Sequence, residues 1–466
     1  MQPNKRKIFG RFRRLHFIGI GGIGMSGIAE ILLRRGIEIT GSDMKKSDVT
    51  DFLESLGAKI YEGHDPKQVE GADLIVHSSA VKEDNPEMKA GRELKIPIIK
   101  RDIMLGELMR MKVGIGIAGT HGKTTTTSMT GMVLIEGEVD PTIVVGGKVK
   151  DFGSNARVGE GDIIIVEADE YDRTFLSLTP TIAVITNIEA EHLDIYHNGL
   201  EEIKETFIQY ANKVPFFGLV VCCIDEPHVQ DILPNIERRV MTYGTSSQAD
   251  LQAVDIVFHS KGCTFGVEFN GEKLGEIHLQ VPGLHNVKNA LAAIGVGLEL
   301  EIPFDVIKKG IEKFGGVQRR FSIKLDQDFM VVDDYGHHPS EVKATISAAK
   351  SGWPKRRIVA VFQPHLFSRT KDFAADFGRA FMNADTVYVL DIYPSREKAE
   401  NYPGITGETI TTFAKKFGHK DVRFFPDKNN IPSELQKEVK SGDIVIFMGA
   451  GDITKFADSF AESNKK

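Results

Sequence analysis

The chain has 466 residues, which suggests about three domains at roughly 150 residues each. Apolar residues make up 41% and charged residues 26%, an ordinary globular mixture. With 58 basic and 65 acidic residues, the net charge of −7 argues mildly against a surface for nucleic acid or an anionic membrane. The cysteines Cys222, Cys223 and Cys263 form no CxxC pair, which disfavours a disulfide framework and a cysteine-built zinc site and fits a reducing compartment.

The N-terminus imitates a signal peptide, because basic residues between Lys5 and Arg14 precede an apolar run. Glycines interrupt that run, and a helical pattern containing Glu30 follows it, so secretion is not expected. No stretch of about 18 uninterrupted apolar residues occurs, which predicts no membrane span. The cytoplasm is the expected location.

Strand-like apolar runs alternate with helical patterns along the chain, which predicts an α/β fold with mainly parallel sheets. The expected strands of a first group are 15–20, 37–40 and 74–77, and those of a second are 113–118, 142–145, 163–166 and 183–186. Alternating runs at 263–269 and 277–281 predict a small antiparallel patch, and helical patterns at 286–300 and 306–314 follow it. The expected strands of a third group are 329–332, 358–362, 387–390 and 444–448.

These groups predict three domains. We expect a Rossmann-like N-terminal domain over residues 1–108 and a central domain over 109–315 that is similar to P-loop ATPases. A second Rossmann-like domain is expected over 316–466. The pair Gly315-Gly316 is a plausible hinge before it, because glycine accepts backbone angles that other residues resist.

The first motif is a glycine-rich turn between a predicted strand and a predicted helix. Its glycines are Gly19, Gly21, Gly22 and Gly24. They permit a tight turn and let backbone N–H groups approach a diphosphate at the positive end of the helix. Asp43 follows the next strand, where an acid can bind a ribose hydroxyl. The motif does not distinguish NAD from another nucleotide diphosphate, and a glycine-rich packing turn is the alternative.

The second motif is the strongest. The run Gly119-Thr120-His121-Gly122-Lys123-Thr124-Thr125 follows a predicted strand and precedes a helical pattern. Backbone N–H groups and Lys123 would cradle the phosphates of a nucleotide, and the Thr124 hydroxyl would face Mg²⁺. The loop is a shorter variant of GxxxxGK[ST], since Ile117 stands where the first glycine is usual.

Acidic residues and a histidine follow two neighbouring strands of the second group. Glu167 is first off one buried strand and is the best Mg²⁺ ligand candidate, because Mg²⁺ prefers carboxylate oxygens. Asp169 and Glu170 could instead cap the next helix. His192 lies past the next strand and could bind a second cation or orient a nucleophile, although a lone histidine is usually structural.

The third group has polar clusters at its expected strand ends. They are Asp334 with His337 and His338, Gln363 with His365 and Arg369, and the pair Arg319-Arg320 at the hinge. Paired arginines suit anions, because guanidinium binds carboxylate or phosphate through two hydrogen bonds. Each cluster alone could be an ordinary surface feature.

Together, the motifs predict a diphosphate pocket in one domain and a Mg·triphosphate pocket in the next. This favours ATP-driven chemistry on a nucleotide-linked substrate over two alternatives. A NAD-dependent oxidoreductase would use only the first loop, and a P-loop regulatory ATPase would use only the second. The residues indicate phosphoryl transfer but not its acceptor.

The same motifs resemble the Mur ligases, the ATP-dependent amide-bond enzymes of peptidoglycan synthesis. The resemblance rests on the run from Gly119 to Thr125, Glu167-Ala-Asp-Glu170, His192-Leu-Asp194 and His285-Asn286-Val-Lys-Asn289. It is closest to the members that join L-alanine to UDP-N-acetylmuramate. That likeness rests on the first glycine motif, Gly41-Ser42-Asp43, His77-Ser-Ser-Ala80, Asp334-Tyr-Gly-His-His-Pro339 and Phe362-Gln-Pro-His365.

The resemblance implies a role for each matching residue. Gly19, Gly21, Gly22, Gly24, Ser42, Asp43 and Ser78 would hold the UDP part of UDP-N-acetylmuramate. The run from Gly119 to Thr125 would hold the ATP phosphates, joined by Asn286, Arg320 and Asp334. Thr124, Glu167 and His192 would bind magnesium, and the catalytic residues would be Lys123, Glu167 and His192. His365 and Arg369 would hold L-alanine.

The implied reaction has two steps. The lactyl carboxylate of UDP-N-acetylmuramate takes the γ-phosphoryl group of ATP, and the amine of L-alanine then attacks the acyl phosphate. Phosphorylation supplies the leaving group that a carboxylate lacks, and closure of the third domain would exclude water. The expected partners are UDP-N-acetylmuramate, L-alanine and ATP, with no nucleic acid or membrane, and the expected assembly is a monomer or homodimer.

Three positions depart from the family pattern. Phe207 lies near the position where some members carry a carbamylated lysine, and Lys204 is offset, so that modification is not predicted. Leu366 replaces an arginine of some alanine ligases, which moves the expected carboxylate contact toward Arg369. Tyr171 matches the related ligase that attaches a tripeptide, the nearest alternative within the family.

Overall fold

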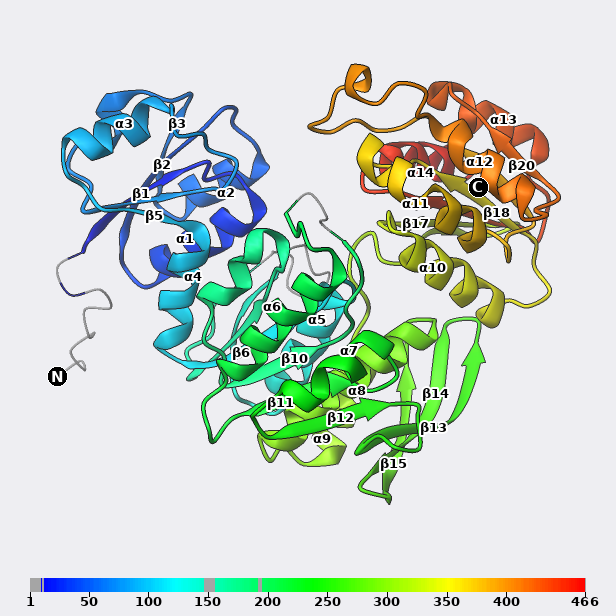
Figure 1. The fold of residues 1–466 in the computed structure, drawn as a ribbon, viewed down its shortest axis with the longest axis horizontal. Helices are drawn as coiled ribbons and strands as arrows, with labels where there is room; N and C mark the ends of the chain where they lie inside the picture. The colour runs from blue at the N-terminus through cyan, green and yellow to red at the C-terminus, as the bar shows by residue number, and fades with distance from the viewer. Residues whose placement is uncertain (1–9, 11, 146–155, 192–194, 466) are drawn as a thin grey trace. The chain divides into compact units, whose positions relative to one another are not determined.

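The structure is a computed structural model that describes residues 10, 12–145, 156–191 and 195–465. The chain divides into two compact units. The first comprises residues 1–252, 268–272 and 289–313, and the second comprises 253–267, 273–288 and 314–466. Each unit is described by itself, and Figure 1 labels the elements.

The first unit begins with a five-stranded parallel sheet in the order β3-β2-β1-β4-β5. Its strands are β1 (Arg14–Ile18), β2 (Glu38–Asp43), β3 (Lys59–Glu62), β4 (Leu74–His77) and β5 (Ile98–Lys100). The helices are α1 (Ile23–Arg34), α2 (Asp48–Ser55), α3 (Pro86–Glu93) and α4 (Arg101–Arg110), with a 3-10 turn at Pro66–Val69. The strand order reverses between β1 and β4, and such a switch point is where open parallel sheets bind ligands.

The same unit contains seven strands of a larger sheet, in the order β12-β11-β10-β6-β9-β7-β8. They are β6 (Val113–Ala118), β7 (Thr142–Val144), β8 (Ala156–Arg157), β9 (Ile163–Glu167), β10 (Ile182–Ile185), β11 (Leu219–Cys223) and β12 (Val240–Gly244). All pair in parallel except β7 with β8. The helices include α5 (Lys123–Glu136), α6 (Leu200–Asn212), α7 (Pro227–Ile232) and α9 (Phe304–Lys313), with 3-10 turns η2 (Tyr171–Ser177) and η3 (Leu233–Asn235). Helix α8 (Leu284–Glu299) has residues in both units.

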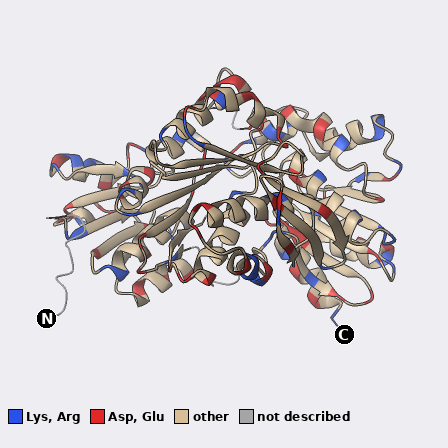
Figure 2. Ribbon diagram, turned by 90° about the horizontal axis from the view of Figure 1, so that it is seen from below, with Lys and Arg blue, Asp and Glu red and all other residues tan. Residues whose placement is uncertain are grey.

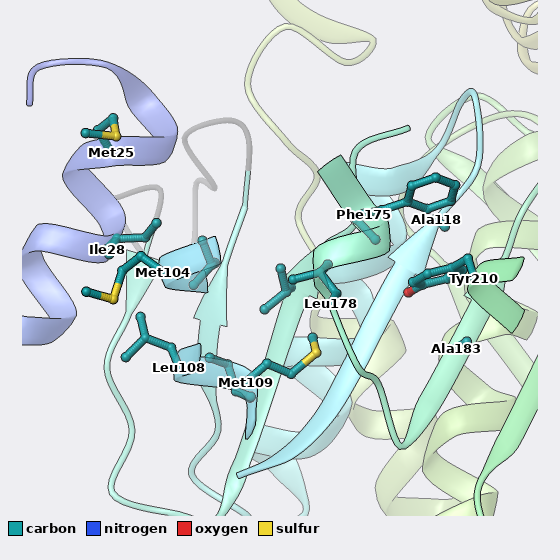
Figure 3. Packing of buried hydrophobic residues seen from close by; sticks show 14 of the residues in the cluster. Met25, Ile28, Met104, Leu108, Met109, Ala118, Phe175, Leu178, Ala183 and Tyr210 are labelled. Carbon is teal, nitrogen blue, oxygen red and sulfur yellow. The ribbon is translucent and has the colours of Figure 1, made fainter. Parts of the chain in front are cut away.

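One apolar core connects the two sheets of the first unit. Met25 and Ile28 of α1 pack with Met104 and Leu108 of α4, and the same cluster extends to Tyr210 of α6 (Figure 3). Helix α4 therefore lies between the first sheet and the second and fixes their spacing within this unit.

The second unit contains most of three neighbouring strands, β13 (Leu251–His259), β14 (Gly262–Phe269) and β15 (Glu272–Leu279). Two residues join each strand to the next. Neighbouring strands joined so tightly run antiparallel, which agrees with the predicted antiparallel patch.

A six-stranded sheet follows in this unit, in the order β16-β17-β21-β18-β19-β20. Its strands are β16 (Ser322–Asp326), β17 (Met330–Asp334), β18 (Ile358–Phe362), β19 (Thr386–Val389), β20 (Val422–Phe424) and β21 (Ile444–Met448). Only β16 pairs antiparallel. The helices are α10 (Pro339–Gly352), α11 (Phe367–Ala380), α12 (Gly407–Lys416), α13 (Ile431–Glu438) and α14 (Ile453–Ser463), with 3-10 turns η4 (Ala399–Asn401) and η5 (Lys428–Asn430).

The described sheets confirm the predicted α/β class with mainly parallel strands. Charged residues lie mostly on helices and loops, while the strands are largely uncharged (Figure 2). This distribution follows from burial of parallel strands on both faces, which leaves little room for charge.

Candidate active site

The first glycine motif forms the connection from β1 to α1. Ser42 at the end of β2 positions it, because its carbonyl accepts hydrogen bonds from Gly19 N (2.8 Å) and Ile20 N (3.1 Å). The Asp43 carboxylate accepts one from Gly21 N at 2.8 Å. Asp43 therefore holds the loop itself, a role that the sequence did not predict.

Ser78 follows β4 and reaches the same edge of the sheet. Its backbone N–H donates to the Ile18 carbonyl (3.2 Å), and a Cβ on Gly19 would lie 3.3 Å from the Ser78 Cβ. The predicted UDP-binding residues from Gly19 to Asp43 and Ser78 are thus brought together at the strand-order switch. The Ser42 hydroxyl points away into the core, where it donates to the buried Glu87 carboxylate at 2.7 Å.

The second motif connects β6 to α5, which begins at Lys123. Gly119 has a φ of 135°, and a Cβ there would lie 2.0 Å from the Thr186 hydroxyl oxygen, so only glycine fits. Helix α5 has no side-chain cap at Gly122 and no acid in its first turn. Its positive end is therefore available to an anion.

Lys123 is paired within this loop. Its ammonium group donates to Glu170 Oε2 and to the Gly119 carbonyl, both at 2.7 Å. Burial opposes the charged form of Lys123, but Glu170, Asp169 and Glu167 raise its pKa and keep it protonated. Burial raises the pKa of Glu170 to about 7 against the opposing charge of Lys123. Glu170 thus holds the lysine in place without a nucleotide.

The three carboxylates at the end of β9, those of Glu167, Asp169 and Glu170, have different roles. The Thr124 hydroxyl donates to Glu167 Oε1, so these two oxygens lie together at the end of β9. Hard oxygen donors of this kind suit Mg²⁺. Asp169 accepts from Tyr171 N at 3.2 Å, which is the capping alternative, whereas Glu170 makes no cap bond to η2. His192 lies outside the described residues.

The segment after β10 is hydrogen-bonded to the loop that begins at Gly119. Asn187 accepts from His121 N (2.8 Å) and donates to the His121 carbonyl (3.0 Å), to which Thr186 also donates (2.6 Å). Glu189 N donates to the Thr120 hydroxyl at 2.9 Å. Sequence reasoning singled out this segment only for His192 and missed Asn187, although its position just after a strand was a usable signal.

Gly122 of the motif and Thr126, the residue that follows the motif, face α8. The Thr126 hydroxyl donates to Asn289 Oδ1 at 3.1 Å, and a Cβ on Gly122 would approach the same oxygen to 2.6 Å. Thr125 and Thr126 are buried, so they pack the base of the loop.

In the second unit, Asp334 ends β17 and holds two neighbouring backbone segments. Its carboxylate accepts from Phe321 N and Gly336 N, both at 2.7 Å, and burial raises its pKa. The Arg320 guanidinium carbon lies 5.3 Å from the Tyr335 ring centre, and its Nη1 lies 3.1 Å from Glu341. Arg320 therefore lies beside Tyr335, the residue that follows Asp334.

Asn286, the other predicted ATP contact of this unit, lies at the start of α8. Its side-chain amide donates to the Pro282 carbonyl at 2.7 Å. The adjacent His285 is half-buried, and desolvation lowers its pKa to about 4.

His365 and Arg369 lie together at the start of α11. The Arg369 guanidinium donates to His365 Nδ1 at 3.3 Å, and the histidine ring stacks on Tyr393 with the centroids 5.9 Å apart. Burial, then the charges of Arg369 and His337, lower the pKa of His365 to about 4. The pair therefore presents a neutral imidazole beside a guanidinium, which can bind a carboxylate.

Comparison with known protein families accounts for these sites. The model of the Mur ligase family, catalytic domain, matches residues 14–113, and that of the Mur ligase middle domain matches 117–297. The Mur ligase, glutamate ligase domain, matches 319–451. The chain belongs to the Mur ligase family. Both glycine motifs, the acidic strand end and the His365–Arg369 pair fall within these matched ranges.

Individual Mur ligases match the chain over nearly its whole length. It is 52% identical to UDP-N-acetylmuramate--L-alanine ligase of Salinibacter ruber, covering 97% of this chain and 95% of the relative. It is 49% identical to the protein of that name from Trichlorobacter lovleyi, covering 98% and 100%. The crystal structure of UDP-N-acetylmuramate-alanine ligase from Thermotoga maritima superposes with a TM-score of 0.80 at 30% identity, covering 97% and 98%.

In the part of the chain that the structure describes, no helix has both the length and the apolar character needed to cross a bilayer.

Proposed function

We propose that this chain is an ATP-dependent ligase that joins L-alanine to the lactyl carboxylate of UDP-N-acetylmuramate in peptidoglycan precursor synthesis. The observation that carries this proposal is the near-complete match to relatives named for that activity, at 52% and 49% identity. The phosphate loop and its neighbouring carboxylates supply the chemistry that such a ligase needs.

ATP is proposed to bind with its phosphates on the run from Gly119 to Thr125. The ammonium group of Lys123 would leave the Glu170 carboxylate and bind the β- and γ-phosphates, because phosphate oxygens carry more charge than one carboxylate. Thr124 and Glu167 fit a Mg²⁺ ion, since their oxygens already meet at the loop. When bound, Mg²⁺ would neutralise charge on the phosphates. We retain His192 as a proposed further ligand and catalytic residue.

The UDP group is proposed to bind at the Gly19–Gly24 loop. Gly21, Gly22 and Gly24 would present the N-terminus of α1 to the diphosphate, and Ser78 would line the neighbouring strand end. The carbonyl of Ser42 and the carboxylate of Asp43 hold this loop. We propose that Ser42 and Asp43 contribute to UDP binding and that they also fix the shape of this turn.

L-alanine is proposed to bind through its carboxylate at Arg369 and His365. The neutral imidazole would donate or accept a hydrogen bond without repelling the ammonium form of the incoming amino acid. Asn286, Arg320 and Asp334 are proposed as further ATP contacts, with Arg320 supplying positive charge.

The proposed reaction has two steps, and in each step one bond forms while another bond breaks. A lactyl carboxylate oxygen bonds to the γ-phosphorus while the bond to the β-phosphate oxygen breaks, and ADP leaves. The unprotonated alanine nitrogen then bonds to the acyl carbon, the carbon–oxygen bond to phosphate breaks, and the nitrogen releases a proton. Lys123 stabilises the charge that develops on the transferred group.

The test is phosphate release by the whole chain with ATP, Mg²⁺ and UDP-N-acetylmuramate, comparing L-alanine, glycine, L-serine and the tripeptide. We expect release to require UDP-N-acetylmuramate and to be fastest with L-alanine, with the amide product identified by mass. Release without the UDP substrate would indicate an ATPase instead. Preference for the tripeptide would indicate the related tripeptide-attaching ligase, whose sequence Tyr171 matches. Saturable NADH binding would favour an oxidoreductase.

We also propose domains at 1–108, 109–315 and 316–466. The matched family ranges 14–113, 117–297 and 319–451 support three successive domains. The second range ends at residue 297, before the proposed boundary at 315. Because the reaction consumes ATP, we propose that it occurs in the cytoplasm, with the chain acting as a monomer or homodimer.

A further inference from the structure

An arginine that the sequence motifs do not include lies against the first glycine loop. Arg101 is the first residue of α4, and its side chain crosses over Gly24 in the first turn of α1. A Cβ on Gly24 would lie 2.5 Å from Arg101 Nη1 and 3.2 Å from its Cδ. Gly24, the last glycine of the motif, therefore makes room for this guanidinium at the end of the helix.

Neither helix end beside Arg101 has an acidic side chain that forms an ion pair with it. Helix α1 has no side-chain cap at Gly22 and no acidic residue in its first turn. Helix α4 has no side-chain cap either, and the carboxylate of Asp102, its one first-turn acid, accepts from the Ser177 hydroxyl at 2.6 Å. Within the described part of the chain, Arg101 makes no ion pair, and the Asp43 carboxylate accepts a hydrogen bond from Gly21 N.

This arrangement is electrostatically unfavourable without a ligand. The N-terminus of a helix carries about half a positive charge, and a cation placed there is destabilising. Arg101 is at the N-terminus of its own helix and beside that of α1. A bound anion would convert this repulsion into attraction to all three positive groups.

We propose that Arg101 binds the diphosphate of the UDP-linked substrate. The inference rests on the proposed function and adds a binding residue to its site. A guanidinium can donate two parallel hydrogen bonds to phosphate oxygens, which the N–H groups of the glycine loop cannot supply in that geometry. The lactyl carboxylate of the substrate must reach the γ-phosphate of ATP, and uridine is uncharged. The diphosphate is therefore the anionic part of the substrate that is left to bind this guanidinium.

The backbone of Arg101 is rigidly placed for this role. Met104 and Leu108 of the same helix pack against Met25 and Ile28 of α1 (Figure 3). The Asp102–Ser177 hydrogen bond anchors the first turn of α4 to η2. Binding therefore orders only the end of one side chain, which limits its entropic cost.

The test measures UDP and ATP binding by isothermal titration calorimetry on the full chain, comparing wild type with Arg101→Met, which keeps length but removes charge. We expect Arg101→Met to weaken UDP binding about ten- to a hundredfold, as for a lost hydrogen bond to a charged group, and to leave ATP affinity unchanged. Arg101→Lys should recover part of the loss. Arg110→Met is the matched control, because Arg110 ends the same helix and pairs with the exposed Glu107.

Two readouts separate binding from packing. The salt dependence of UDP affinity should be shallower in Arg101→Met, because one charge has been removed from the contact. In turnover assays, KM for UDP-N-acetylmuramate should rise while kcat stays within a few-fold of wild type. Wild-type affinity for UDP in Arg101→Met, or an equal loss of UDP and ATP affinity, would overturn the assignment.

A second variant covers the case in which Arg101→Met does not fold. Gly24→Ala keeps the arginine but places a methyl group where Nη1 lies, so it should also weaken UDP binding. Unchanged UDP affinity in a folded Gly24→Ala protein would count against the proposal. If wild type itself neither binds UDP nor turns over UDP-N-acetylmuramate, the proposed function fails; if it does both and the variants match it, only the role of Arg101 fails.

Discussion

The two glycine loops of the first unit place their cations differently. In the loop from Gly119, the lysine lies in the motif itself and is held by Glu170, with Thr124 touching Glu167. In the loop from Gly19, the motif has no cation, and Arg101 approaches from another helix. Both loops follow a parallel strand and open a helix without a side-chain cap.

This difference matches what each proposed ligand does. A diphosphate that is only bound needs a fixed cation, and Arg101 on a packed helix provides one. A phosphoryl group that is transferred changes its charge during the reaction, so its cation must follow it. A flexible lysine with an exchangeable carboxylate partner suits that role.

The largest effect should come from removing the lysine. We expect Lys123→Met to lower kcat by a factor on the order of 100–1,000 or more, because the transferred group loses charge stabilisation. UDP binding by the same variant should be unchanged, since the first loop has its own cation. Steady-state kinetics with UDP titration would check both, and near-wild-type turnover would refute the role of Lys123.

A smaller effect is expected at Asp43, which shapes the first loop. Asp43→Ala removes the acceptor of Gly21 N and should raise KM for the UDP substrate about tenfold, as expected for one charge-assisted hydrogen bond. KM for ATP should not change, and Glu93→Ala on an exposed helix face serves as the control. An effect confined to ATP would show that the two loops are not independent.

Much of this fold could be predicted from local pattern. The predicted strands at 74–77, 113–118, 358–362 and 444–448 have the same bounds in the structure, because each is a continuous apolar run. The strands β3 and β5 were missed, since short edge strands bury few residues and have no such run. The fully buried β11 was also missed, so an apolar run was not by itself enough to identify every strand.

The candidate site was predictable in its motifs but not in its partners. Lys123 and Glu167 follow from spacing at strand ends, whereas pairing of Lys123 with Glu170 depends on which acid turns inward after β9. Arg101 gave no sequence signal, because its role depends on how α4 packs across α1. Long-range packing of this kind has no counterpart in a local pattern.

The smallest expected effect concerns Glu170, the buried carboxylate that pairs with the lysine of the second loop. Burial raises the pKa of Glu170 to about 7, above its ordinary 4.5. Between those values the folded protein holds a proton that the unfolded chain has released, so the free energy of unfolding falls as pH rises. The contribution of this proton is fully present below about pH 4.5 and is lost as pH rises through 7.

Glu170→Gln removes this titration, so its free energy of unfolding should fall less than that of wild type between pH 5 and 7. Urea denaturation of the nucleotide-free chain at pH 5, 6 and 7 would measure the slopes. Arg101→Met should keep the wild-type slope, because Arg101 forms no ion pair with an acidic side chain among the described residues. Glu93→Gln, a surface control, should keep it as well. Equal slopes in wild type and Glu170→Gln would mean that Glu170 is already ionised throughout this range. Lys123 would then be held by a full ion pair that ATP must break at every pH.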